Sequence, residues 1–258
     1  MIKKLAFLAM ILATGIWLLF PAAASAAERL KVKVLASYPH DREAFTQGLQ
    51  IEGETFFEST GLEGQSSLRR VEMKTGKVLK KVDLAPNLFG EGITRVDTRL
   101  VQLTWQHGIA IVWDAETLTE LQRWRYDGEG WGITYDGNQL IQSDGSATLT
   151  FRDPNDFQVQ GRLQVKLDGV PVDHLNELEF AEGKIYANVW GKDHIVRIDP
   201  LTGKVEATIE AKGLLKPSEQ LGTDVLNGIA WDAKTKTFWI TGKRWPKMFQ
   251  VVFEKAGN

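Results

Sequence analysis

Cysteine is absent from all 258 residues of the sequence. The chain therefore has no disulfide and no thiolate to serve as a nucleophile or metal ligand, and its stability must come from its core. An excess of charge of one sign is also missing, because 31 Lys and Arg residues are balanced by 33 Asp and Glu residues. This balance argues against binding of nucleic acid through a basic face.

Several common catalytic motifs are also missing. The four histidines show no H-E-x-x-H or similar metal-ligand spacing, and there is no G-x-S-x-G elbow and no P-loop. The glycine-rich stretch DGEGWG precedes an expected strand, which does not fit a nucleotide-binding loop. We assign no metal ligand from the sequence.

The first 27 residues differ in composition from the remainder. A positive start, MIKK, is followed by the apolar run LAFLAMILATGIWLLF and the small-residue tail PAAASAA. This order is typical of a secretory signal peptide. The alternative is a permanent membrane anchor, since the apolar run approaches spanning length. We expect cleavage, export to the periplasm or the medium, no stable membrane association afterwards, and one domain over residues 28–258.

Five stretches of the remaining chain resemble one another: FTQGLQI, FGEGITR, EGWGITY, HLNELEF and VLNGIAWD. A glycine precedes Leu or Ile in four copies, and Glu177 takes its place in the fourth. Successive copies are 44, 40, 45 and 51 residues apart, and each runs through a polar turn into a second apolar run. A repeat of this length that carries about four short strands is typical of a propeller blade.

The two ends of the mature chain predict how the repeats close into a ring. The fifth copy is one strand short, and RLKVKVLASYPH supplies a single strand before the first copy. We therefore predict an all-β fold, a five-bladed β-propeller closed by the N-terminal strand completing the last blade, which removes an open sheet edge. The alternative is a sandwich of unrelated hairpins. A closed propeller is expected to be a monomer.

The repeat also predicts which side chains share one rim. The start of each innermost strand should lie beside the end of the strand that returns from it. The residue before the glycine position is Gln47, Glu91, Trp131, Asn176 or Asn227, and 14 residues later come Gly61, Trp105, Gly145 and Trp190. In the fifth copy Lys243 follows after 16 residues.

A rim of three indoles, a carboxylate, amides and an ammonium group is typical of a binding cavity with an apolar wall. In FGEG, we expect the glycines on either side of Glu91 to leave space for a ligand in front of its carboxylate.

Ten ordered motifs give the chain a resemblance to a known family. The chain resembles the glutaminyl-peptide cyclotransferases of the plant and bacterial type in these motifs: FTQGL, the ESTGL segment, FGEGIT, QLTW, EGWGIT, SDGS, LNELE, ANVW, DVLNGIAWD and TGKRWP. The resemblance covers nearly all of the mature chain. It implies a five-bladed propeller that converts the N-terminal glutamine of peptides or proteins to pyroglutamate and releases ammonia. It also implies catalysis without zinc or any other required cofactor, and it leaves open a structural calcium ion in the channel.

The resemblance also implies site residues. Its pocket positions fall on Phe45, Gln47, Phe89, Glu91, Trp105, Trp131, Asn176, Trp190 and Lys243.

We expect Glu91 to move a proton from the attacking α-amine to the leaving nitrogen, and Lys243 and Asn176 to stabilise the oxyanion. Gln47, the phenylalanines and the indoles are expected to bind the substrate. Glu63 is a departure from the family pattern and affects the outer lip of the pocket. Two other interpretations stay open: a non-catalytic peptide-binding propeller of the cell envelope, and a metal-dependent, lactonase-like propeller hydrolase.

Overall fold

The structure is a computed structural model, and it describes residues 26–257. The predicted signal peptide, residues 1–27, therefore lies almost entirely outside the described residues. Between residues 26 and 257 the regular structure consists of strands and a single 3-10 turn, η1 (Pro217–Glu219), as expected for an all-β chain. No helix in this part of the chain is long and apolar enough to cross a membrane.

Three sheets of four strands each follow the chain order without a crossover. Neighbouring strands are antiparallel, and aspartate turns join several of them. The carboxylate of Asp114 accepts a 2.7 Å bond from the backbone N–H of Thr117, which closes the turn between two strands. The sheets consist of β2 (Thr46–Glu52), β3 (Thr55–Thr60), β4 (Ser67–Glu72) and β5 (Val78–Asp83); β6 (Gly90–Val96), β7 (Arg99–Thr104), β8 (Ile109–Asp114) and β9 (Glu120–Arg125); and β10 (Ile133–Tyr135), β11 (Leu140–Gln142), β12 (Thr148–Arg152) and β13 (Val159–Gln164).

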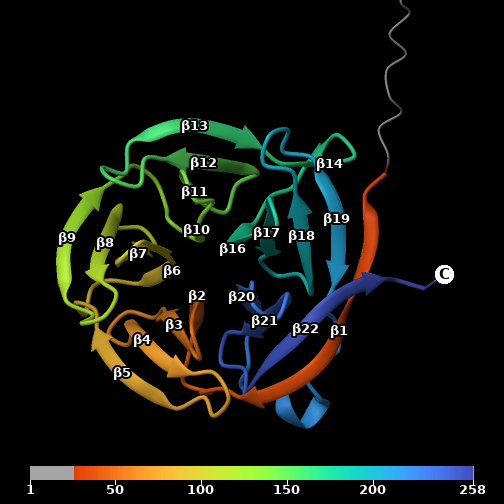
Figure 1. The fold of residues 1–258 in the computed structure, drawn as a ribbon, viewed down its shortest axis with the longest axis horizontal. Helices are drawn as coiled ribbons and strands as arrows, with labels where there is room; N and C mark the ends of the chain where they lie inside the picture. Colours follow the sequence, from red (N-terminus) through yellow and green to blue (C-terminus); the bar gives the residue numbers. More distant parts are fainter. Residues whose placement is uncertain (1–25, 258) are drawn as a thin grey trace, which may run out of the picture.

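The last two repeats share one sheet of eight strands, whereas the sequence predicted two separate blades. The cause is β1 (Glu28–Pro39), which pairs along its length with β22 and, through residues 28–31, with β19 in parallel. Figure 1 shows β1 curving along the outside of the strands that belong to these last two repeats. The other strands are β16 (Leu175–Ala181), β17 (Lys184–Val189), β18 (His194–Ile198), β19 (Val205–Glu210), β20 (Leu226–Asp232), β21 (Thr237–Gly242) and β22 (Lys247–Lys255); a small hairpin, β14 (Lys166–Leu167) and β15 (Val170–Pro171), precedes β16.

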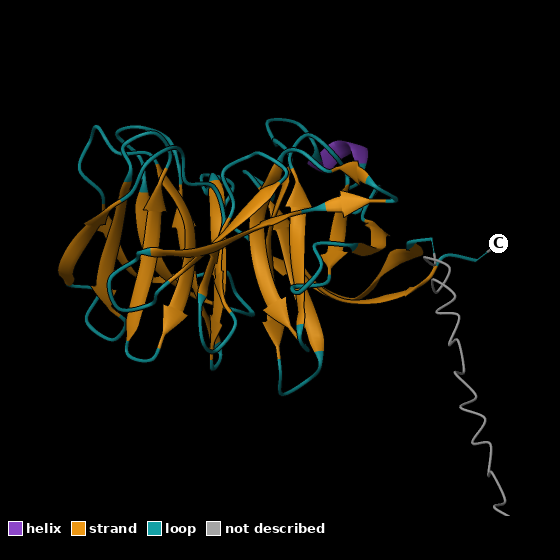
Figure 2. Cartoon of the chain, turned by 90° about the horizontal axis from the view of Figure 1, so that it is seen from above, coloured by secondary structure: helices purple, strands orange, loops and turns teal. Residues whose placement is uncertain are grey.

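The groups of strands surround a common centre (Figure 1). Each innermost strand contacts the next, in the order β2, β6, β10, β16, β20, and β20 contacts β2 again. One hydrophobic cluster fills each space between neighbours; for example, Phe57 and Leu68 pack against Ile93 and Ile111 between the first two sheets. Figure 2 shows the strands running between two opposite faces, on which the loops gather.

The glycines of the repeat are required by close packing of the innermost strands. A Cβ atom on Gly92 would lie 2.7 Å from the backbone nitrogen of Ile133, and one on Gly90 would lie 2.7 Å from the carbonyl oxygen of Thr60. Both contacts would be clashes between the added Cβ and backbone atoms, and no change of side-chain rotamer would relieve them. The prediction that these glycines provide the space for a ligand was therefore wrong, because the room beside their Cα atoms is occupied by backbone of neighbouring strands.

In the fourth repeat, Glu177 replaces the glycine and bonds across the centre. Its fully buried carboxylate accepts hydrogen bonds from the backbone N–H of Leu49 on β2, at 3.2 Å, and of Ile229 on β20, at 2.7 Å. These bonds satisfy two inward N–H groups that would otherwise lack partners. Glu177, which takes the place of the glycine, thus connects the innermost strands β16, β2 and β20.

Candidate active site

A cavity of about 430 Å³ opens where the innermost strands begin. Its volume is in the range of about 300–1,000 Å³ that is usual for small-molecule pockets. The structure brings all nine predicted site residues together in this pocket and adds one histidine. The lining residues are Phe45, Gln47, Phe89, Glu91, Trp105, Trp131, His174, Asn176, Trp190 and Lys243.

The hairpin register places these side chains. The backbone N–H of Trp105, at the end of β7, donates a 3.0 Å bond to the carbonyl of Phe89, before β6. In the fourth repeat the N–H of Trp190 donates to the carbonyl of His174 at 2.8 Å in the same way. The start of each innermost strand therefore lies beside the end of the next strand, as the repeat predicted.

Glu91 is buried at the base of the pocket, on β6. Its Oε1 accepts a 3.0 Å hydrogen bond from the side-chain amide of Gln47, on β2. Gln47 is oriented in turn by Asn227, whose Nδ2 donates to Gln47 Oε1 at 3.1 Å. Asn227 was predicted on the rim, but it lies behind Gln47 and supports it. Amides of two other repeats thus hold the carboxylate in place.

A second chain of bonds fixes the backbone of Glu91. Its carbonyl accepts a bond from the hydroxyl of Ser59, which accepts a 2.7 Å bond from the amide of Gln102. The indole N–H of Trp113 donates to Gln102 Oε1 at 3.1 Å. These three side chains are all buried. Such a support restricts the movement of a site residue.

The pKa values of Glu91 and Lys243, which both line the pocket, are shifted in opposite directions. Burial raises the pKa of Glu91 well above that of an ordinary carboxyl; the positive charge of Lys243 opposes this effect and the charge of Glu129 adds to it. Burial likewise lowers the pKa of Lys243, against the attraction of Glu91 and Asp224. Strongly shifted groups in one cavity are typical of an active site. Glu91 thus keeps its proton at a higher pH than an exposed carboxyl would.

Asn176 contributes an amide to the wall, at the start of β16. Its side chain is buried, and its Oδ1 has no hydrogen-bond partner among residues 26–257. A buried polar atom without a partner costs free energy, so such atoms are expected where a ligand supplies the missing bond. The amide of Asn176 is therefore available to a bound molecule.

Aromatic rings form the rest of the wall. Phe89 meets Trp105 edge-on at a centroid distance of 5.6 Å, and Trp131 meets Trp190 in the same way at 6.3 Å. Gly145 makes this possible in the third repeat, because a Cβ there would lie 2.7 Å from the Trp131 ring. The wall excludes water and leaves few polar groups to contact a substrate.

Sequence reasoning missed two functional residues, His174 and Glu129. The ring of His174 stacks on Trp190 at 5.7 Å and lines the pocket. Glu129 Oε2 accepts hydrogen bonds from the indole N–H groups of Trp105, at 2.8 Å, and Trp131, at 2.9 Å. Both residues lie two positions before a predicted rim residue, as Phe45 and Phe89 do. The spacing within the repeat could therefore have identified both residues.

Two further expectations concern groups outside this wall. Glu63 is exposed and is not one of the lining residues, so the family departure there does not alter the pocket itself. Within residues 26–257 no group of three or more His, Asp or Glu side chains is placed to hold a metal ion.

Comparisons with known proteins agree on one family. Residues 8–253 match the sequence profile described as glutamine cyclotransferase. The chain is 42% identical over 234 residues to a glutaminyl-peptide cyclotransferase of Arabidopsis thaliana, which covers 88% of this chain and 72% of the relative. The crystal structure of Myxococcus xanthus glutaminyl cyclase superposes with a TM-score of 0.81 at 38% identity, covering 90% of this chain and 100% of that one.

Proposed function

The chain belongs to the glutamine cyclotransferase family and acts as a glutaminyl-peptide cyclotransferase, and we propose that its pocket cyclises an N-terminal glutamine to pyroglutamate. In this reaction the α-amine nitrogen attacks the γ-amide carbon, a C–N bond forms, the bond to the amide nitrogen breaks, and ammonia leaves. One proton must travel from the attacking nitrogen to the leaving nitrogen. The observation that carries the proposal is the buried, amide-held carboxylate of Glu91 beside Lys243.

Glu91 is the group we assign to this proton transfer. With ordinary pKa values of about 4.3 for Glu and about 8 for an α-amine, the transfer would cost roughly 5 kcal/mol. Burial raises the pKa of Glu91 and so reduces this difference. The carboxylate accepts a proton from the α-ammonium group, which frees the amine to attack, and the resulting carboxylic acid donates this proton to the departing nitrogen, which leaves as ammonia. The regenerated carboxylate then accepts the second proton that the attacking nitrogen loses as the lactam forms.

The remaining residues have supporting roles in this proposal. The tetrahedral intermediate carries negative charge on the former amide oxygen, and the ammonium of Lys243 stabilises it. The unpartnered Oδ1 of Asn176 suits an acceptor for a substrate N–H group. The sequence suggested that Asn176 stabilises the oxyanion, which requires its side-chain N–H group as a donor. The amide can therefore serve as an acceptor through Oδ1 and as a donor through its nitrogen. The indoles hold the glutamine side chain in its folded shape, ready for ring closure.

Incubation with a glutamine-initiated peptide tests the function. Ammonia should be released in equal amount to the pyroglutamyl product, measured by mass spectrometry. Activity that survives treatment with a chelator would support our proposal that catalysis needs no metal; loss of activity would favour the lactonase-like alternative. Binding of the peptide without turnover would favour the non-catalytic alternative.

We further propose that the fold is a five-bladed propeller, with β1 completing the last blade beside β22. The contacts of β20 with β2 and the antiparallel register of β1 with β22 support this assignment. The composition of residues 1–27 supports our proposal that the chain is exported and then cleaved. Intact mass after export tests the cleavage, and sedimentation tests the proposal that the mature protein is a monomer.

A further inference from the structure

A second cavity, of about 510 Å³, adjoins the active-site pocket. His174 and Trp190, whose rings stack on each other, line both cavities. The wall between them is thus one layer of side chains at the rim. We call the second cavity the hairpin groove, because the β14–β15 hairpin forms one of its sides.

The hairpin has a fixed shape. Asp168 and Gly169 form its two-residue turn, and both have positive φ, of 48° and 87°. Positive φ at both positions is the geometry of a type I′ turn, which matches the twist of the two strands and makes a tight hairpin. The groove is therefore formed in advance of any ligand, which reduces the entropy lost on binding.

Six of the eleven side chains that line the groove are apolar, and the others are Asp168, Asp173, His174, Lys192 and His194. Val170 is 66% exposed at the hairpin, and Trp190 is 46% exposed at the opposite wall. Exposed apolar side chains around one cavity are typical of a binding surface rather than of a solvated loop. The apolar members of the lining are Leu167, Val170, Pro171, Val172, Val189 and Trp190.

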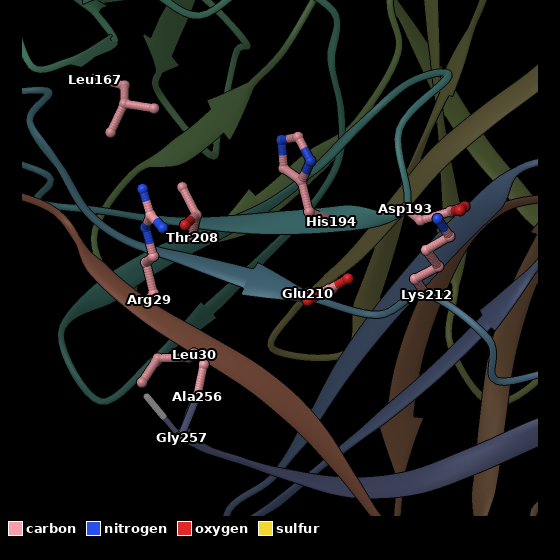
Figure 3. Close-up of a pocket in the computed structure, with 10 residues that line it drawn as sticks. All are labelled: Arg29, Leu30, Leu167, Asp193, His194, Thr208, Glu210, Lys212, Ala256 and Gly257. Atoms are coloured by element: carbon pink, nitrogen blue, oxygen red, sulfur yellow. The ribbon is translucent and has the colours of Figure 1, made fainter.

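The groove also leads away from the active site. Leu167 and His194 line both the groove and a third, outer cavity of about 770 Å³. Figure 3 shows these two side chains among the residues of that outer cavity, together with Arg29 and Glu210. The active-site pocket, the groove and the outer cavity therefore follow one another, each sharing side chains with the next.

We propose that the hairpin groove binds the peptide chain that follows the N-terminal glutamine of the substrate, and that it favours apolar side chains directly after that glutamine. This inference rests on the proposed function. The pocket has room for the reacting residue, and the rest of the substrate must leave across the rim. At Trp105 the rim is bordered by the polar side chains of Gln106 and Glu129. The rim at His174 and Trp190 instead continues into the apolar groove.

Val170→Asp tests the groove with two substrates. Glutamine amide has no residue beyond the glutamine, whereas a Gln-Leu-Leu amide peptide places two leucines in the groove. The variant should lower kcat/KM for the peptide by roughly fivefold, through KM, because an apolar contact of a few tens of Å² is lost. Its kcat/KM for glutamine amide should stay unchanged, which also shows that the variant is folded. Val170→Leu should preserve the preference for the peptide.

Leu121→Asp is the matched control, since Leu121 is 54% exposed on β9 and lines none of the three cavities. It should affect neither substrate. Equal kcat/KM values for both substrates in the wild-type protein, or an unchanged peptide KM in Val170→Asp, would overturn the inference and leave the proposed function intact. Absence of ammonia release from every glutamine substrate would instead reject the proposed function.

Cross-linking locates the peptide directly. A glutamine-initiated peptide with a benzophenone side chain at its second position is bound to the inactive Glu91→Gln variant and irradiated. The cross-link should map to residues 166–173 or 189–194. A cross-link at Gln106 or Glu129 would show that the chain leaves the pocket on the other side, and would overturn the inference.

Discussion

Gln47 donates a 3.0 Å hydrogen bond to the buried carboxylate of Glu91 from a different sheet of the molecule. The bond involves Oε1 of the carboxylate. One carboxylate oxygen is therefore held by a neighbouring amide. This arrangement lets a single group exchange protons with a substrate while its position stays constant.

Replacement of Glu91 by Gln should abolish cyclisation. We expect kcat to fall by about a thousandfold, within the range of about 10²–10⁴ that general acid–base groups contribute. The amide keeps the size of the side chain and removes an ionisable group from a buried site, so the melting temperature should not fall. Ammonia release and a thermal melt provide the two measurements. Near-normal turnover would exclude Glu91 as the proton carrier.

Replacement of Lys243 by Ala should lower kcat more than it raises KM, because its charge stabilises the transition state rather than the bound substrate. Lys234→Ala is the control: this exposed lysine lies in the turn at the other end of the same β20–β21 hairpin. Steady-state kinetics with one glutamine peptide distinguish the two variants. An unchanged kcat in Lys243→Ala would remove this residue from the mechanism.

Glu129 can be tested with two substitutions that separate its bonds from its charge. Glu129→Ala removes the acceptor that orients Trp105 and Trp131 and should raise KM and change the indole fluorescence. Glu129→Gln keeps one oxygen as acceptor but loses the charge that helps raise the pKa of Glu91. In this variant the acidic limb of the profile of rate against pH should therefore shift to lower pH, with little change in KM. Identical behaviour of both variants would contradict this separation of roles.

The stability of the protein should depend on pH through Glu179. Burial raises the pKa of its carboxyl from 4.5 to about 8, although backbone N–H bonds from Trp231 and Phe180 oppose the change. A raised pKa means that the folded state binds the proton more tightly. This contribution to stability is complete below about pH 4.5 and is lost as the pH rises towards 8.

Glu179→Gln should therefore reduce the fall in melting temperature between pH 5 and pH 8. The neutral amide retains an acceptor for the N–H of Trp231. Exposed Glu63→Gln serves as the control and should follow the wild-type curve. Parallel curves for all three proteins would show that Glu179 does not titrate over this range.

The close approach of the innermost strands predicts the effect of adding one methyl group. Gly92→Ala should destabilise the fold by about 1–3 kcal/mol, the usual cost of overpacking, because the added Cβ meets backbone. Gly161→Ala is the matched control, since its Cβ would have its nearest neighbour 3.9 Å away. Denaturant unfolding measures both. Equal stability of the two variants would show that the strands can move apart at no cost.

Much of the site could be predicted because the repeat converts sequence spacing into position. The register placed Gln47, Glu91 and Asn176 at the starts of strands, and Trp105 and Lys243 at the ends of their partners. Their assigned roles stay predictions until they are measured.

What the register could not supply depends on side-chain direction and on distant pairing. The bonds from two indoles to Glu129 require particular rotamers, and rotamers follow from packing rather than from spacing. The parallel pairing of β1 with β19 joins residues that are far apart in sequence, and no local pattern specifies it. The supporting place of Asn227 behind Gln47 likewise follows from packing around the centre.

The pairing of β1 also imposes an order of events on folding. Its partners, β19 and β22, lie near the other end of the chain, so the first strand to be synthesised has no neighbour until residues 205–210 have been made, and lacks its longer partner until residues 247–255 follow. Every sheet between them can form from local hairpins before that moment. The final step is therefore the closing of a long loop, which is slow compared with hairpin formation. We therefore expect β1 to stay unpaired, and open to chaperones that bind extended segments, until β19 has been made.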